Sequence, residues 1–277
     1  MVQLSIRIGF AVSVALLLAG CGRNAVVRPV LVEDGLVPSL SHATGGQLAG
    51  ICADGDDVLV LEASGARILR FDSKLGQVET LSLTNRVVAP RGIAADQFYV
   101  YVFNDRTLFR LLKKDPLLRT WLHGVRTTGL AGFSPGEMLV SDAERGAVWL
   151  KTMFGDSRVF LAAADLVQPG QLAALPDGMF AALSGDNVIV RFNRAGIVSS
   201  RNTLPGQFDL MVADHLGSLY LALSGHPELV VVKTDGRSLR YRLLGVTDAP
   251  VPVGLAISTR GLVVLDRDAR LLLYQLP

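Results

Sequence analysis

Cysteine is scarce in this chain, whose 277 residues include only Cys21 and Cys52. A secreted scaffold stabilised by disulfides needs several cysteine pairs, so that class of protein is excluded. Cys52 lies in the apolar segment Leu48 to Ala53. We expect its thiol to be buried and unreactive.

Net charge is also small. The 27 Lys and Arg residues nearly balance the 25 Asp and Glu residues, which leaves a formal charge of +2. No basic run is interleaved with aromatic residues, so neither a nucleic-acid partner nor a polybasic membrane-binding face is indicated. After residue 21 there is no helical period, and no stretch has the roughly 18 apolar residues that a transmembrane helix needs.

Metal-ligand spacing is lacking as well. No two of the four histidines stand at i, i+2 or i, i+4; they are His42, His123, His215 and His226. No Gly-rich loop follows a strand and opens a helix, so nucleotide binding has no motif. We therefore expect no cofactor and no metal.

The chain does begin with a secretion signal. Arg7 precedes the apolar run Ile8 to Leu18, which is too short to span a bilayer, and small residues follow it. The ending Leu18-Ala19-Gly20-Cys21 resembles the lipobox of bacterial lipoproteins. The resemblance implies cleavage before Cys21 and a diacylglyceryl group on its thiol. An ordinary signal peptide that ends in a cysteine is the alternative.

The lipobox resemblance implies that the protein is located in the cell envelope. Residues 1–20 would be the signal peptide and residues 21–25 the acylated cysteine and its tether, so the protein would be anchored to a bilayer and face the periplasm or the exterior. If Cys21 is acylated, Cys52 has no partner for a disulfide. Gly22 stands where lipoproteins retained in the inner membrane of Gram-negative bacteria tend to have Asp, which favours the outer membrane if the source is Gram-negative.

Residues 26–277 consist of a repeat of about forty residues, the length of one four-stranded propeller blade. Each copy has two apolar runs joined by a polar turn, a pattern typical of antiparallel strands. Copies begin near residues 46, 88, 127, 168, 206 and 250. The corresponding segments are Gly50 to Gly76, Phe98 to Leu112, Met138 to Leu150, Met179 to Phe192, Leu219 to Val232 and Leu262 to Tyr274. The sequence therefore predicts an all-β, six-bladed β-propeller of four-stranded antiparallel blades.

The two ends of the repeat region complement each other. The sixth copy stops at Pro277 after its third strand, whereas Val26 to Val32 forms an apolar segment before the first copy. We expect this N-terminal segment to supply the missing fourth strand and so close the ring. Pro29 is compatible with an outermost strand, which needs no N–H there.

Several copies resemble NHL-type propeller repeats. Pro90 to Asp96, Val251 to Ile257 and Gly50 to Asp54 are similar to the opening Pro-x-Gly-Ile/Leu-Ala-x-Asp, and Leu139 to Asp142 and Val263 to Asp266 are similar to the Tyr-Val-x-Asp segment. The resemblance covers most of the mature chain, but the fourth and fifth copies lack the second Asp. It implies the fold rather than an activity, because propellers include hydrolases, lyases, receptors and scaffolds.

Two motifs that suggest chemistry have simpler explanations. Gly132 to Gly136 matches the Gly-x-Ser-x-Gly pattern around a hydrolase nucleophile. That motif needs a strand leading into a helix, whereas these residues lie between two predicted strands. Asp54 to Asp57 is acidic but lacks the spaced ligands of a calcium loop. We expect hairpin turns at both places and no catalytic residue.

Ligands of propellers usually sit at the mouth of the central channel. In this chain the predicted mouth comprises Gln47, Arg91, Thr128, Gln171, Asp209 and Val253, surrounded by loops that hold Glu62, Asp105, Arg106, Asp142, Glu144, Arg145, Asp186, His226, Asp266, Arg267 and Asp268. Such a ring can accept a small polar ligand or a protein loop, or it is solvated rim. Asp209 is the single carboxylate of the inner ring, which disfavours the metal-dependent chemistry of propeller lactonases.

The function predicted from the sequence is a lipid-anchored interaction or scaffold module of the cell envelope that binds an envelope protein through this polar face. The alternative is an extracytoplasmic hydrolase or lyase, lactonase-like, with its site at the channel mouth. A small-ligand sensor is a third possibility, and it would show a closed axial pocket.

The lipobox makes a direct prediction about the mature protein. Because cleavage occurs before the acylated cysteine, mass spectrometry of protein isolated from its own membranes should find an N-terminal peptide that begins at diacylglyceryl-modified Cys21. A mature chain that retains residues 1–20 would contradict it. A Cys21→Ser chain is the control and should carry no acyl group.

Overall fold

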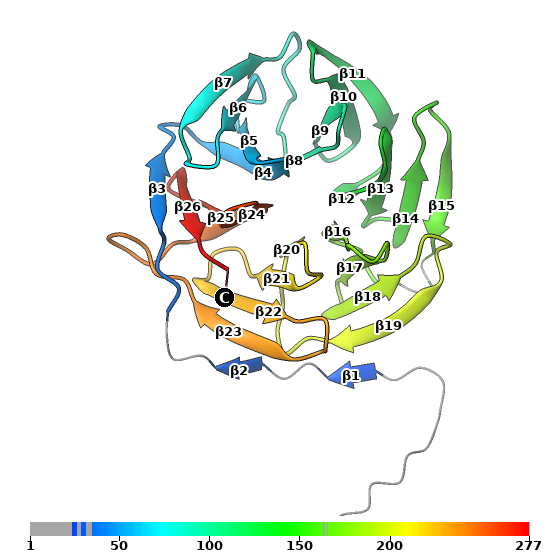
Figure 1. The fold of residues 1–277 in the computed structure, drawn as a ribbon. Helices are drawn as coiled ribbons and strands as arrows, with labels where there is room; N and C mark the ends of the chain where they lie inside the picture. The colour runs from blue at the N-terminus through cyan, green and yellow to red at the C-terminus, as the bar shows by residue number, and fades with distance from the viewer. Residues whose placement is uncertain (1–23, 27–28, 32–34, 163, 165, 277) are drawn as a thin grey trace, which may run out of the picture.

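The computed structural model describes residues 24–26, 29–31, 35–162, 164 and 166–276. The predicted signal peptide and Cys21 lie outside these residues. Six sheets are arranged as blades around a central axis (Figure 1). The described residues contain strands and no α-helix, which confirms the predicted all-β propeller.

Each blade has four antiparallel strands in chain order, with the first strand nearest the axis. Blade 1 comprises β4 (Leu48–Asp54), β5 (Asp57–Glu62), β6 (Arg67–Phe71) and β7 (Gln77–Ser82); blade 2, β8 (Gly92–Ala95), β9 (Tyr99–Phe103), β10 (Thr107–Leu112) and β11 (Asp115–His123); blade 3, β12 (Thr127–Ser134), β13 (Glu137–Asp142), β14 (Ala147–Lys151) and β15 (Ser157–Leu161). Blade 4 comprises β16 (Leu172–Ala174), β17 (Phe180–Ser184), β18 (Val188–Phe192) and β19 (Val198–Thr203); blade 5, β20 (Leu210–Ala213), β21 (Leu219–Ala222), β22 (Glu228–Val232) and β23 (Ser238–Arg242); blade 6, β24 (Pro252–Ser258), β25 (Gly261–Asp266), β26 (Arg270–Tyr274) and β3 (Leu40–Ala43).

The core lies between the blades. Six hydrophobic clusters of described residues each join two neighbouring blades. In one of them Leu59 and Leu61 of β5 pack with Val100 of β9. The middle strands are apolar on both faces because each face meets another blade, which explains their nearly continuous hydrophobic runs.

An N-terminal strand closes the ring, as predicted. It is β3, which pairs antiparallel with β26 in the register Leu40 to Leu273 and Ala43 to Arg270. Leu40 packs into the cluster between blades 6 and 1, and His42 contacts the edge of Phe71 at 5.2 Å between ring centroids. His42 therefore belongs to a blade.

The prediction that Val26 to Val32 is this fourth strand is wrong. The described parts of that region form β1 (Asn24–Val26) and β2 (Pro29–Leu31), which add in parallel to β19 and β23 as fifth, outermost strands of blades 4 and 5 (Figure 1). The alternating burial of β3 suits an outer strand with one packed face. The prediction favoured Val26 to Val32 because that segment is more apolar than Leu40 to Ala43.

The Asp of the NHL-like motif has a structural role. The Asp96 carboxylate accepts hydrogen bonds from the backbone N–H groups of Phe98 and Tyr99 and from the Tyr101 hydroxyl, each at 2.8 Å. It also accepts one from Gly136 N at 2.7 Å, in the next blade. One half-buried carboxylate thus shapes its own turn and joins two blades, which explains why the repeat places Asp here.

The disc has two faces, each made of a different set of turns. The front face, toward the viewer in Figure 1, carries the turns between the first and second and between the third and fourth strands, together with the C-terminal end of β26. The back face carries the turns between the second and third strands and the connections between blades. Across the described residues, no helix meets the length and apolarity that crossing a membrane requires.

Backbones of neighbouring inner strands approach closely at the axis. A Cβ on Gly129 would lie 2.5 Å from the Gly170 carbonyl oxygen and 2.7 Å from the Gln171 Cα, whereas a Cβ on Gly132 of the same strand would meet nothing within 4 Å. Backbone atoms of an adjacent blade cannot move aside as a flexible side chain can. Residue 129 must therefore be Gly for blades 3 and 4 to pack.

We predict that Gly129→Ala lowers the free energy of unfolding by about 1–3 kcal/mol, the usual cost of overpacking. Gly132→Ala is the matched control in β12 and should be neutral or slightly stabilising. Urea denaturation of both variants measures the difference. Equal stability of the two would refute this account of the inner-strand packing.

Candidate functional site at the channel mouth

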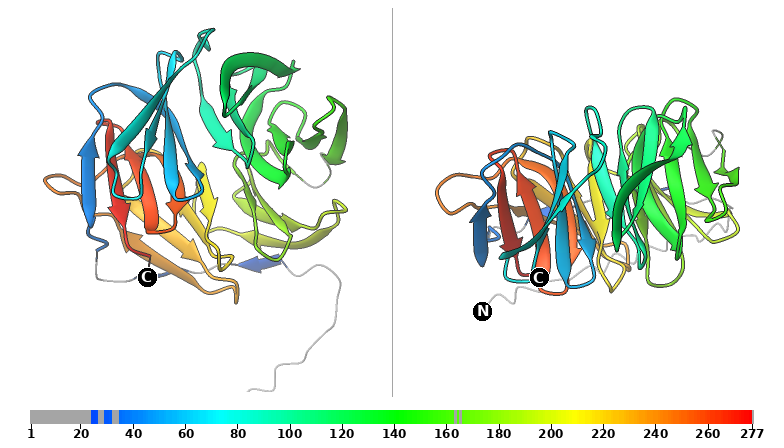
Figure 2. Two further views of the ribbon diagram at one scale, coloured as in Figure 1. Left: turned by 45° about the horizontal axis from the view of Figure 1, so that its top comes forward. Right: turned by 90° about the horizontal axis from the view of Figure 1, so that it is seen from above.

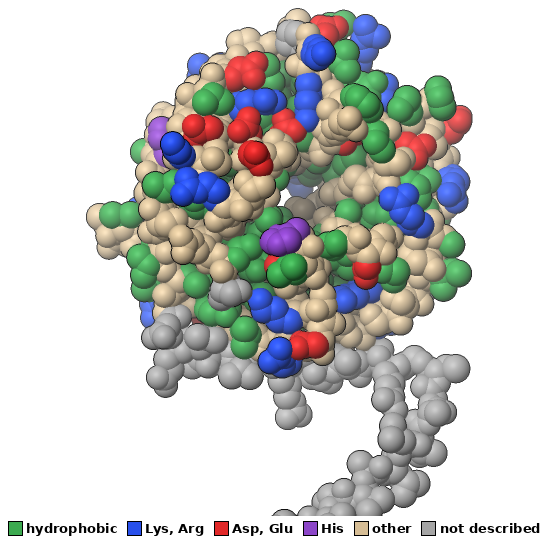
Figure 3. Space-filling model, in the orientation of Figure 1, with side chains coloured by type: hydrophobic (Ala, Val, Ile, Leu, Met, Phe, Trp, Pro, Cys, Tyr) green, Lys and Arg blue, Asp and Glu red, His purple; other side chains and the backbone are tan. Residues whose placement is uncertain are grey.

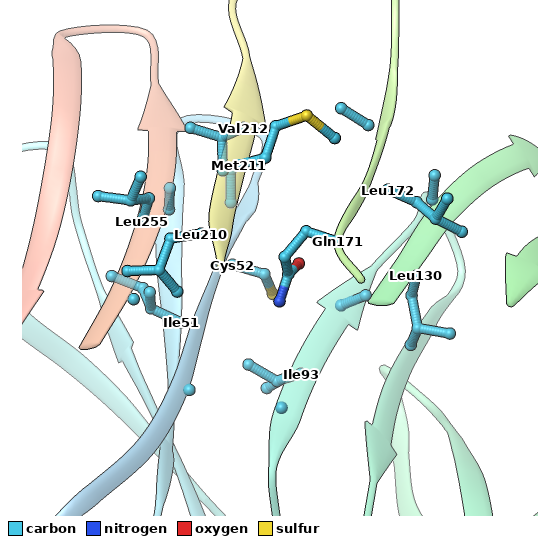
Figure 4. A pocket seen from close by; sticks show the side chains of 18 of the residues that line it. Ile51, Cys52, Ile93, Leu130, Gln171, Leu172, Leu210, Met211, Val212 and Leu255 are labelled. Atoms are coloured by element: carbon cyan, nitrogen blue, oxygen red, sulfur yellow. The ribbon is translucent and has the colours of Figure 1, made fainter. Parts of the chain in front are cut away.

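A cavity of about 270 Å³ runs along the axis, and a hollow opens at the centre of the front face (Figure 3). All six inner strands line it, with β4, β8, β12, β16, β20 and β24 each contributing residues. Most of the lining side chains are small or aliphatic, such as Ile51, Ile93 and Leu130 (Figure 4). The channel is therefore a narrow and mainly apolar cavity.

Two polar side chains distinguish the cavity lining. Gln171, at the start of blade 4, is half-buried and extends its amide into the cavity (Figure 4). Arg91, at the start of blade 2, is exposed, and its guanidinium pairs with Asp105 at 2.9 Å. An amide and a paired cation can orient a polar ligand by hydrogen bonds, but they provide no general acid and base.

Cys52 also lines this cavity, which the sequence did not indicate. It is half-buried rather than fully enclosed, and its thiol is free (Figure 4). Burial, followed by the nearby Asp54 carboxylate, raises the pKa of the thiol above its usual range, despite an opposing effect of Lys113. A thiol with a raised pKa is a poor nucleophile at neutral pH, which agrees with the unreactive cysteine expected from the sequence.

The predicted mouth residues separate into two groups. Arg91, Gln171 and Val253 line the cavity. Thr128 does not, because its hydroxyl donates to the Pro169 carbonyl oxygen at the boundary with blade 4 and contacts Ser141 Oγ of its own blade at 2.9 Å. Gln47 and Asp209 do not line the cavity either and are exposed on the back face. Gln47 precedes β4, and Asp209 accepts a hydrogen bond from Ser224 N at 2.7 Å.

Two predicted loop carboxylates are used by the fold itself. Asp142 is buried and accepts hydrogen bonds from Glu144 N and Arg145 N, at 3.1 and 3.2 Å, and from the Arg145 guanidinium at 2.8 Å. Asp266 is buried as well; it accepts one from Val251 N at 2.7 Å and pairs with Arg270. Neither carboxylate reaches the cavity.

The remaining predicted residues lie on an exposed surface of mixed charge. Arg145, His226 and Arg267 are exposed on turns between second and third strands. An ion pair at 2.8 Å between Arg106 and Glu144 joins the loops of blades 2 and 3. Exposed pairs of this kind contribute little stability, so the back face is a polar surface with charges of both signs.

Within the described residues, no three His, Cys, Asp or Glu side chains are grouped so that they could hold a metal ion. A metal-dependent hydrolysis at the channel mouth would need such a group, since divalent cations in hydrolases are held by several charged or imidazole ligands.

The relatives found share the fold. No family model matches the chain, and no curated protein sequence matches it. Solved structures that it resembles include virginiamycin B lyase from Staphylococcus aureus (10% identity, TM-score 0.62, 86% of this chain and 98% of that chain) and a gluconolactonase from Xanthomonas campestris (17% identity, TM-score 0.63, 83% and 86%). A chain from a nidogen/laminin complex is also similar (15% identity, TM-score 0.61, 72% and 83%). Identities this low show a common propeller fold alone.

The raised pKa of Cys52 predicts slow thiol chemistry. At pH 8 a free cysteine is partly ionised, whereas the native Cys52 thiol should stay protonated. An aromatic disulfide reagent should therefore modify it much more slowly in the native protein than in urea. Equal rates in the two conditions would show an accessible thiolate in the channel and contradict this description.

Asp142 should matter for stability. We predict that Asp142→Ala lowers the free energy of unfolding by about 1–3 kcal/mol, because two turn N–H groups lose their buried acceptor. Asp186→Ala, at an exposed acid in the corresponding turn of blade 4, is the control and should change stability little. Thermal denaturation compares them, and an unaffected Asp142→Ala protein would show that the carboxylate is free for another role.

Proposed function

We propose that this protein is a lipid-anchored, extracytoplasmic propeller that binds another protein of the cell envelope through its back face. The anchor is proposed from the lipobox that ends at Cys21, and Gly22 favours the outer membrane if the source is Gram-negative. A six-bladed disc on such an anchor presents a broad, rigid surface of loops.

One observation carries the binding role. The two loop carboxylates that could have acted at the channel mouth, Asp142 and Asp266, are buried and already bound. Asp142 accepts hydrogen bonds from N–H groups of its own turn, and Asp266 accepts one from Val251 N and pairs with Arg270. What is exposed around the mouth is a mixed set of polar side chains with charges of both signs. Surfaces of this kind are typical of rims of protein–protein interfaces, where charge sets orientation and partner choice.

The alternative, a hydrolase or lyase acting at the channel mouth, would need an acid–base pair or an activated nucleophile at the cavity. Among the described lining residues, the candidates are Cys52, whose pKa is raised, and Arg91, which is paired. Neither has the environment that such a reaction requires. The interaction role is therefore the better proposal.

Co-purification tests the proposal. Tagged, lipidated protein is recovered from its own membranes, and a partner should accompany it in stoichiometric amount. Exposed His226 and Arg267 lie on neighbouring turns of the back face, since a Cβ on Gly225 would lie 3.3 Å from Arg267 Nη2. We predict that replacing both with Glu reduces partner recovery at least about tenfold, by reversing the local charge.

The control is Arg260→Glu, which makes a similar charge change on an exposed front-face turn and should retain the partner. Recovery of no stoichiometric partner, even with the unaltered protein, would contradict the proposed function. So would full recovery with the doubly substituted back face.

A further inference from the structure

The turn between the third and fourth strands is built in the same way in blades 3, 4 and 5. In each, a Gly N–H donates to the carbonyl three residues earlier: Gly155 to Thr152 at 3.2 Å, Gly196 to Asn193 at 3.0 Å and Gly236 to Lys233 at 3.0 Å. The two tip residues are Arg194-Ala195 in blade 4, Thr234-Asp235 in blade 5 and Met153-Phe154 in blade 3. This turn does not require apolar tip residues, so the Met-Phe pair needs another explanation.

Phe154 is the most exposed large hydrophobic residue of those described, at 91% of its surface. Hydrogen bonds from a buried lysine fix the turn that carries Phe154. The buried Lys151 ammonium donates to the Gly155 carbonyl and to Ser157 Oγ. The structure thus presents an aromatic ring to the solvent on a fixed support.

Other exposed apolar residues lie near it on the front face. We define the front apolar patch as Phe98, Leu112 and Leu117 of blade 2, Met153 and Phe154 of blade 3, and Ile197 of blade 4, which are 36–91% exposed. They stand at turns or at strand ends next to turns. Exposed apolar groups gathered on one side of a protein mark a binding site for protein or membrane.

The charges around the patch are mainly positive. Lys114, Arg119, Arg158 and Arg194 are exposed, against three exposed acids, Asp115, Asp156 and Asp177. A second cavity of about 220 Å³ in blade 2 is lined by Arg110 and Arg119, by one acid, Asp115, and by Leu112 and Leu117 of the patch. Arg110 is held over the rings of Tyr99 and Trp121, at 4.5 and 4.9 Å. Two guanidinium groups next to apolar side chains suit a phosphate attached to acyl chains.

Acidic side chains of the front face gather over blade 1, at the upper left of Figure 3. They include Asp54 and Asp57, both of which pair with Arg70. Charge therefore differs across the front face, and the acidic region meets the patch at Lys113, which pairs with Asp54. An anionic surface would be attracted to the side of blades 2 to 4 and repelled from blade 1.

The position of β1 connects this patch with the proposed anchor. β1 begins at Asn24, three residues after Cys21, a distance that an extended chain spans in at most about 11 Å. Because β1 runs parallel to β19, its N-terminal end points toward the start of β19, next to the front-face turn with Ile197. An acyl group on Cys21 would hold this side of the disc close to a bilayer.

We propose that the front apolar patch, led by Phe154, docks on the surface of a bilayer that contains anionic phospholipid, so that the back face points away from the membrane. This inference rests on the proposed lipid anchor. A lipid surface fits better than a protein partner, because the most exposed apolar side chain protrudes on a turn tip, basic residues outnumber acids around it and the N-terminal end of β1 points toward the same side. An aromatic ring inserted among headgroups with flanking basic residues is the usual chemistry of interfacial binding.

The test uses the lipidated full-length product reconstituted into vesicles of phosphatidylethanolamine and phosphatidylglycerol. In a Cys52→Ala background, an environment-sensitive fluorophore is attached at Asp156→Cys, beside Phe154. Arg237→Cys is the matched control at the corresponding turn position of blade 5, and Val246→Cys reports on the back face. We expect a blue-shifted emission at 156 that lipid-borne nitroxide quenches, and solvent-like emission at 237 and 246.

Two changes should remove the signal at 156. Adding Phe154→Ser should abolish most of the blue shift, although the residue is too exposed to matter for folding, and vesicles of phosphatidylcholine alone should weaken it. Solvent-like emission at 156 in the anionic vesicles would overturn the inference, as would protection that appears only when envelope proteins are added.

Flotation of the same vesicles separates the two proposals. If the protein floats with the vesicles but position 156 remains in water, the docking inference fails while the anchor stands. If the protein does not float, both the anchor and the docking are wrong.

Discussion

The packing of one blade against the next is the constraint on which this structure depends. The middle strands have no polar face, so each blade must be covered on both sides, and only a closed ring covers all six. Without β3, blade 6 would lack the strand that brings Leu40 into the cluster between the last and first blades. Closure therefore determines where the N-terminal region runs, around the rim of blades 4 and 5 and into blade 6 (Figure 1).

The repeat made much of this fold predictable. The middle strands lie in the predicted segments, as β9 and β10 do within Phe98 to Leu112, since an apolar run between polar turns has few alternatives in a propeller. The closing strand was misplaced because Leu40 to Ala43 is short and half polar, whereas Val26 to Val32 is more hydrophobic. A strand packed on one face alone needs only alternate apolar residues, and four residues give that pattern little weight.

The candidate site was harder to predict, because it depends on which side chains are exposed and the sequence does not show this. Asp142 and Asp266 end the second strand of their blades, where a ligand could be exposed. Asp142 instead accepts hydrogen bonds from its own turn, and Asp266 accepts one from Val251 N, in the connection that leads into β24. Cys52 lies in an apolar strand, yet it lines the channel because that strand, β4, is the inner strand of blade 1. A comparison of equivalent turns could have singled out Phe154, because a Met-Phe pair stands where blades 4 and 5 have Arg194-Ala195 and Thr234-Asp235.

Together these features describe a rigid disc with two different faces. Its channel is narrow and mostly apolar, its back face is polar with charges of both signs, and its front face has basic and apolar turns on one side. In this account an acyl anchor and the front apolar patch orient the disc, which leaves the back face for a protein partner. The fold provides the support, and the surface residues determine the role.

Amide hydrogen exchange on the anchored protein tests this two-faced arrangement most directly, comparing anionic vesicles with detergent solution. The account predicts that vesicles slow exchange in the front-face turns at residues 113–117 and 152–156, while the back-face turns at 185–187 and 223–227 exchange equally in both. Slower exchange on the back face, or no difference between the faces, would contradict it.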